Sequence, residues 1–253
     1  MGSSFHLISA VLIFATGLAG GAWAMRAGAS TSSRGELVIR MGAAMAGGVF
    51  LGAGLIHMLG DASDNLGRAF PDLDFPLAFA IATLGFVVVL LVERVVFRAA
   101  SAATGPYAYI LTMVLGLHSL LAGIALGIEG SAIVGLAIVI AILAHKGAAA
   151  FPLAVSFVKA GMARKRAWGL IATFSTVTPL GILIGSLLGS ALPERPGEIV
   201  EGIFDALAAG SFLYIAAIDI IHEEFGEGEH SHIPAFAALL AGLCLMAVLA
   251  IFV

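Results

Sequence analysis

Eight apolar segments, each close to twenty residues long, leave this chain few ways to fold. They cover about residues 5–25, 38–59, 76–97, 107–128, 132–158, 168–190, 199–221 and 233–253. A helix needs roughly 20 apolar residues to cross the hydrocarbon core of a bilayer, and it satisfies its own backbone hydrogen bonds there. The sequence therefore predicts an all-α polytopic membrane protein with eight transmembrane helices, forming a single transmembrane domain over residues 1–253.

Composition excludes several function classes. The 253 residues are 60% hydrophobic and only 11% charged, whereas a soluble domain carries roughly 25% charged residues. Cys244 is the only cysteine, so no internal disulfide can form. The sequence contains no GxxxxGK[ST] phosphate loop, so we expect no ATP hydrolysis by this chain. The first apolar segment lacks a basic start and a cleavage site, which predicts a retained helix.

Basic residues in the connecting loops predict the orientation. Cytoplasmic loops carry the excess of Lys and Arg. Nine basic residues follow the first, third and fifth segments, against two on the opposite side: Arg26, Arg34, Arg40, Arg94, Arg98, Lys159, Arg164, Lys165 and Arg166, against Arg68 and Arg195. Both termini are therefore expected outside the cytoplasm, in an integral protein of the plasma (inner) membrane.

Three ionisable residues lie in the middle of apolar segments: His118, His145 and Lys146. A lysine at bilayer depth costs about 2.5–3.5 kcal/mol on insertion scales, and such residues usually face the bundle interior. Neutral imidazole is the commonest metal ligand and suits zinc, iron, copper or nickel. The pair therefore indicates a metal site, although a single buried histidine is more often a satisfied hydrogen-bonding residue.

The surroundings of this pair leave alternatives open. Ser119 and Thr178 can supply hydroxyls, and no Cys or Met pair accompanies the histidines, which argues against copper(I). Lys146 could lose its proton on burial, pair with a carboxylate, or fill the place of a second metal ion. Asp205 is a candidate for the carboxylate.

Residues 46–61 resemble residues 208–223. The segments read AGGVFLGAGLIHMLGD and AAGSFLYIAAIDIIHE, and identical pairs include Phe50 with Phe212 and Ile56 with Ile218. In the predicted topology the two segments cross the membrane in opposite directions. Inverted repeats are typical of secondary transporters, with the substrate site near the midplane. Chance similarity between apolar helices is the alternative.

The same alignment places polar residues at both ends of a possible ion path across the membrane. His57 and Asp61 lie four residues apart, toward the outside, and match Asp219 and Glu223 toward the cytoplasm, where His222 is adjacent. Residues four apart share one helix face. We interpret them as weak binding steps at the entrance and exit, with Asp205 also counted in the pathway; ordinary polar residues at span ends are the alternative.

Five motifs of this sequence resemble those of the Zrt/Irt-like protein (ZIP) family of divalent-metal transporters. The resemblance is strongest to the branch of animal plasma-membrane zinc importers. The motifs are His118-Ser-Leu-Leu-Ala-Gly-Ile-Ala-Leu-Gly127, Leu143-Ala-His-Lys-Gly147 and Thr178-Pro-Leu-Gly-Ile182, with Ala46-Gly-Gly-Val-Phe-Leu51 and Ala209-Gly-Ser-Phe-Leu-Tyr-Ile215. The resemblance implies eight helices, with inverted three-helix repeats around spans four and five, and metal carried into the cytoplasm.

Several positions depart from the family pattern. The resemblance implies a two-metal centre completed by glutamates, which are replaced here by Ala122 and Ala149, and Phe50 stands where some members have a methionine ligand. Lys146 and Thr178 occupy positions of second-site ligands. The resemblance therefore implies a mononuclear centre of His118 and His145, with Ser119, Lys146 and Thr178 as a charge-substituting second centre.

The expected function is import of a divalent transition metal, zinc first and iron or another metal second. The ion is cargo, so no cofactor and no enzymatic activity are expected. The expected partners are the ion and the lipid bilayer, with a homodimer as one assembly to consider and no nucleic acid. Two alternatives stay open: a transport-impaired metal-binding or regulatory relative, and an intramembrane zinc enzyme. The enzyme is disfavoured because no H-E-x-x-H motif is present.

Overall fold

The computed structural model describes residues 3–28, 33–97, 105–188, 194–226 and 232–251, which are helical throughout apart from short connections. No strand occurs in these ranges. The helical elements are α1 (Ser3–Gly28), α2 (Ser33–Gly52), η1 (Ala53–Met58), α3 (Leu59–Ala69), α4 (Leu77–Leu90), η2 (Leu91–Phe97), α6 (Gly105–Ile128), α7 (Ala132–Lys159), α8 (Arg164–Leu188), α9 (Glu194–Tyr214), η3 (Ile215–Ile221), α10 (His222–Glu224) and α11 (Ile233–Leu249). The predicted all-α membrane fold is confirmed.

The helices agree with the predicted spans in order and position. Within the described ranges, seven helices are long and apolar enough to cross a membrane, and the shorter apolar helix Ile233–Leu249 follows them. Its 17 residues correspond to about 25 Å at 1.5 Å per residue, near the lower limit for a span. The second helical segment continues ten residues past its predicted end. The added residues form α3, which carries polar side chains and so was not counted in the apolar segment.

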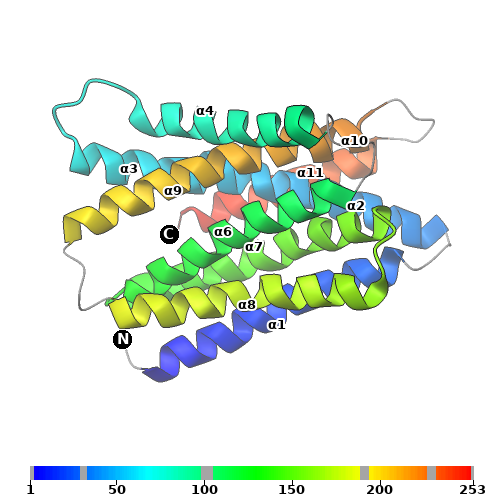
Figure 1. Ribbon diagram of the computed structural model, residues 1–253, viewed down its shortest axis with the longest axis horizontal. Coiled ribbons are helices and arrows are strands. Elements are labelled where there is room, and N and C mark those ends of the chain that lie inside the picture. Colours follow the sequence, from blue (N-terminus) through cyan, green and yellow to red (C-terminus); the bar gives the residue numbers. More distant parts are fainter. Residues whose placement is uncertain (1–2, 29–32, 98–104, 189–193, 227–231, 252–253) are drawn as a thin grey trace.

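The helices form two groups (Figure 1). One group contains α1, α6, α7 and α8, and the other contains α2 with α3, α4, α9 and α11. The most extensive helix–helix contacts in the described residues all lie within a group: α6 with α8, α2 with α11, α1 with α7, and α4 with α9. Between the groups, α2 lies against α7 and α6 lies against α9.

Glycines set the closest contacts inside each group. A side-chain carbon at Gly123 of α6 would collide with the carbonyl oxygen of Thr178 in α8, and one at Gly181 of α8 would collide with that of Leu120. In the second group, Gly48 of α2 meets the backbone of Leu239 in α11 in the same way. Lipid tails are as apolar as the helices, so close backbone packing of this kind is a main source of helix association in a bilayer.

All three π-helical segments of the described chain, η1, η2 and η3, lie in the second group. Two of them coincide with the sequence repeat: η1 begins at Ala53 and η3 begins at Ile215, which are matched positions in the alignment of 46–61 with 208–223. π-Helical turns are rare and often occur at functional sites. They place His57 and Asp219 on distorted turns of their helices.

Gly123→Val should destabilise the protein, because its side chain has no room against the carbonyl of Thr178. Overpacking of a tight contact costs about 1–3 kcal/mol, so we expect a fall of several degrees in Tm in detergent. Gly116→Val is the matched control on the same helix, since a side-chain carbon at Gly116 meets no atom within 4 Å. Equal melting temperatures for the two variants would contradict the close packing of α6 on α8.

Candidate metal centre

His118 of α6 and His145 of α7 lie side by side in the first helix group. Their ring centres are 5.6 Å apart with an interplanar angle of 49°. Two imidazoles that ligate one tetrahedral zinc ion through bonds of about 2.0–2.1 Å hold their ring centres roughly 5 Å apart. The two side chains are therefore placed to share one ion with only a small adjustment.

One ring nitrogen of each imidazole lacks a hydrogen-bond partner in the part of the chain that the structure describes. His118 Nε2 and His145 Nδ1 are buried and have no hydrogen-bond partner among the described residues, and the two residues are 9% and 6% exposed. A buried polar atom without a partner costs free energy, so native structures usually supply one. A metal ion bound between the two rings would supply a partner for both nitrogens at once.

Lys146 is held by neutral oxygens. Its Nζ donates to Ser119 Oγ at 2.9 Å, to the carbonyl oxygen of Phe174 at 3.0 Å and to Thr178 Oγ1 at 3.0 Å. It also lies 3.7 Å from the centre of the Phe174 ring. The carbonyl of Phe174 is also the ordinary helical acceptor of the Thr178 N–H, four residues later, so Lys146 adds a second donor to it.

The suggested pairing of Lys146 with Asp205 is not found. An ammonium has three N–H donors, and all three are used by oxygens of α6 and α8. No ion pair between Lys146 and Asp205 occurs among the described residues. Lys146 is 2% exposed, so its amine is buried, and its described contacts are three neutral oxygens and an aromatic face.

Apolar side chains occupy the positions at which the family resemblance implies further metal ligands. Phe50 of α2 and Phe212 of α9, matched positions in the repeat, have ring centres 4.9 Å apart. The Phe212 ring also lies 4.9 Å from the His118 ring. Ala149 belongs to the buried core, and Ala122 packs beside a second cluster. No group of three or more His, Cys, Asp or Glu suited to a metal occurs in the described residues.

A chain of polar residues leads from the centre toward the loop between α3 and α4. His57 of η1 interacts electrostatically with both His118 and His145, and its Nδ1 lies 3.0 Å from Asp61 Oδ2. His57 and Asp61 therefore lie on one helix face, as their spacing predicts, and are also in contact. Asp61 in turn interacts electrostatically with Glu201 and Asp205 of α9.

Glu201 was missed in the sequence. Its spacing of four residues from Asp205 places both carboxylates on one face of α9, and that spacing was the available signal. What the sequence could not supply is the approach of α3 to α9, which brings Asp61 to the same carboxylates.

The opposite end of the path is described only in part. The side chains of Asp219 and Glu223 lie outside the part of the chain that the structure describes, as do residues 227–231 of the following loop. His222 is exposed. Glu224 is buried, and its Oε2 lies 3.6 Å from Arg40 Nε of α2. These exit residues stay a prediction.

Thr178→Val should lower the stability of the protein, because it removes one acceptor from a buried ammonium while keeping the shape of the side chain. A hydrogen bond to a charged group contributes about 1.5–3 kcal/mol. Thr176→Val is the control on the same helix: Thr176 is exposed and bonds only to its own helix, at Ala172. Thermal melting of both variants in detergent checks this, and a Thr178→Val protein as stable as the control would exclude a structural role for the bond.

Comparison with known proteins shows the family to which the chain belongs. The sequence matches the family described as ZIP Zinc transporter over residues 3–107 and 98–250. Zinc transporter ZIP1 of Bos taurus is 28% identical over 246 residues, which cover 79% of this chain and 74% of that protein. Zinc transporter ZIP2 of Mus musculus is 23% identical over 81% of this chain and 82% of its own length. Since the family match extends over nearly all of the described helices, the chain belongs to the ZIP zinc transporter family.

Proposed function

We propose that this protein imports zinc into the cytoplasm, one ion at a time, through a centre formed by His118 and His145. The family is one of transporters and not of enzymes, and the apolar helices make the chain an integral membrane protein. The observation that carries the proposal is the pair of buried imidazole nitrogens, for which the described part of the chain offers no hydrogen-bond partner. Zinc is the ion named for the family and its relatives, and neither gives support to iron.

The proposed route begins at the carboxylates of Asp61, Glu201 and Asp205. A dication is attracted by clustered negative charge, and His57 connects Asp61 to the two central histidines. From the centre, the ion leaves through the exit residues Asp219, His222 and Glu223. Weak binding at each step suits transport, because an ion that is held too tightly does not leave.

A single ion at the centre is supported by the charge of Lys146. Its ammonium is close enough to His118 to interact with it electrostatically, and no carboxylate compensates it among its described partners. Two unit charges 4 Å apart interact by about 4 kcal/mol at an effective dielectric of 20. A second dication in the Ser119–Lys146–Thr178 centre would be repelled by the ammonium of Lys146. The ammonium therefore takes the place of the second metal ion.

The two helix groups provide the moving parts. Glycine-mediated backbone contacts make each group a tightly packed unit. The metal ligands belong to α6 and α7 of the first group, whereas His57, Asp61 and Phe212 belong to the second. A movement of the first group against the second would carry the His118–His145 centre past the fixed Phe212 ring, from the entrance side to the exit side.

Removing either ligand should abolish zinc uptake. In proteoliposomes loaded with a fluorescent zinc indicator, we expect His118→Ala and His145→Ala to reduce the initial rate at least tenfold, since changes around a metal site typically cost 10–100-fold. His6→Ala is the control, because His6 lies near the start of α1 and outside the proposed route. Zinc uptake at the control rate in both variants would contradict the assignment of His118 and His145 as metal ligands. Zinc binding by the unchanged protein without any flux would instead favour the transport-impaired alternative.

Lys146→Met should tighten zinc binding at the centre. The substitution keeps the length of the side chain and removes the charge that opposes the ion, so we expect at least a tenfold lower Kd in calorimetry of the detergent-purified protein. Lys165→Met is the control, since Lys165 is exposed at the start of α8. A Kd unchanged or raised by Lys146→Met would show that the ammonium does not act on the ion.

The proposed orientation puts both termini outside the cytoplasm of a plasma-membrane protein. Cys244→Ser removes the only cysteine, so single cysteines can then be introduced at Asp72 and at Gly161. In intact cells, an impermeant maleimide should label Asp72→Cys, whereas Gly161→Cys should react only after permeabilisation. The reverse pattern would invert the predicted direction of the chain. A homodimer stays a prediction.

A further inference from the structure

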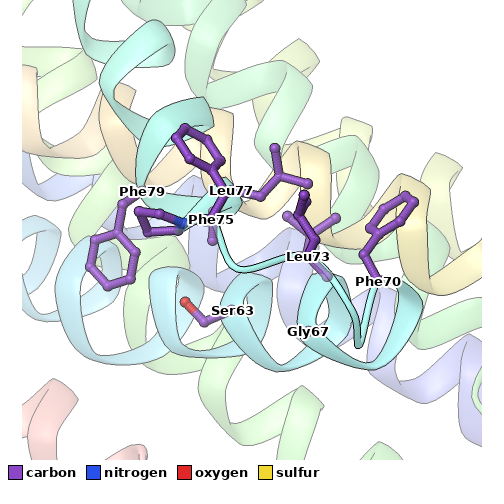
Figure 2. Close-up of a pocket in the computed structure, with 10 residues that line it drawn as sticks. Ser63, Gly67, Phe70, Leu73, Phe75, Leu77 and Phe79 are labelled. Carbon is purple, nitrogen blue, oxygen red and sulfur yellow. The ribbon is translucent and has the colours of Figure 1, made fainter.

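A small apolar groove lies between the end of α3 and the start of α4, and its lining includes neither His118 nor His145 (Figure 2). Its volume is about 140 Å³, and its lining includes Ser63, Gly67, Phe70, Leu73, Phe75 and Phe79. The connection that closes it is ordered by backbone hydrogen bonds from Leu73 to Phe70 and from Leu77 to Phe75. A cavity of roughly 150 Å³ lined by apolar side chains accepts a molecule of the size of benzene. The groove therefore has room for part of a hydrocarbon chain.

The surroundings place this groove at the surface of the bilayer. Phe75 and Phe79 are each 55% exposed, while the adjacent residues of α3 and the loop are charged: Asp64, Arg68, Asp72 and Asp74. Aromatic and charged side chains mix in this way where hydrocarbon meets headgroups. At that depth an open apolar groove would contact water. A lipid chain from the adjacent leaflet is the apolar material closest to it.

Two carboxylates are the sequence neighbours of Leu73, a lining residue of the groove. Asp72 and Asp74 flank Leu73 and are exposed, and neither forms an ion pair within the described residues. The neighbouring cation, Arg68, is already engaged, with Nη2 donating to Asn65 Oδ1 at 2.5 Å and Nε lying 3.5 Å from Glu198 Oε1. The edge of the groove near Asp72 and Asp74 is therefore complementary to a lipid headgroup that carries a positive group. It repels a headgroup that carries only negative charge.

We propose that the groove binds an acyl chain of a phospholipid with an ammonium headgroup, whose nitrogen lies against Asp72 and Asp74. Gly67 opens onto the groove: a side-chain carbon there meets no atom within 4 Å. A larger side chain at this position should fill the space that the acyl chain takes. The two aspartates contribute to the choice of headgroup, and the groove contributes the contact with the chain.

The test uses the full-length protein in nanodiscs. A phosphatidylethanolamine with a photoactivatable acyl chain is crosslinked, and the labelled peptides are located by mass spectrometry. We expect labelling to concentrate in the segment 63–79. Gly67→Leu should reduce this labelling at least fivefold, whereas Gly169→Leu, on α8 and also without neighbours within 4 Å, should leave it unchanged. Asp72→Asn with Asp74→Asn should remove the preference for phosphatidylethanolamine over phosphatidylglycerol with the same chains.

Three results would overturn the proposal. One is labelling of 63–79 no stronger than labelling of other lipid-facing helices such as α11. The second is equal labelling by the phosphatidylglycerol probe in the unchanged protein. The third is full labelling of a folded Gly67→Leu protein. If Gly67→Leu does not elute as a folded protein in gel filtration, the double asparagine variant decides alone, because its substitutions lie in an exposed loop.

Discussion

The buried amine of Lys146, which has no carboxylate partner in the described part of the chain, governs the centre of this protein. Lys146 extends from α7 and binds one oxygen of α6 and two of α8, so a single side chain joins three helices of the first group. A charge in such a place is costly unless it is well solvated by protein dipoles. The three acceptors and the Phe174 ring provide that solvation. The neighbouring histidines then share their surroundings with a fixed positive charge.

Much of the fold could be predicted from the sequence, because a bilayer permits few structures. Apolar runs of span length determined the helices, and the motif around His118 and His145 indicated which helices meet. The pairing of Lys146 with Asp205 was wrong for a physical reason. Charge alone suggested a carboxylate, but the donors of an ammonium are equally satisfied by hydroxyls and by a carbonyl. A backbone carbonyl such as that of Phe174 cannot be recognised as an acceptor from the sequence.

Tertiary contacts account for the other differences. Glu201 joins Asp61 and Asp205 only because α3 packs on α9, an approach that spacing within one helix cannot show. The π-helical turns were also not predicted, yet η1 and η3 begin at matched positions of the repeat. Glycines lie at the closest helix contacts, and only the structure shows which backbones they bring together. Those contacts divide the helices into two groups, with the histidines on one and the Phe50–Phe212 pair on the other.

The most direct measurement of the central claim is the number and environment of zinc ions held by the purified protein. Equilibrium dialysis against saturating zinc, followed by elemental analysis and by X-ray absorption at the zinc edge, gives both quantities on one sample. The account predicts one zinc ion per chain at saturation, with two imidazole nitrogens at about 2.0–2.1 Å. Two ions per chain at saturation, or a single ion whose ligands include no imidazole, would contradict it.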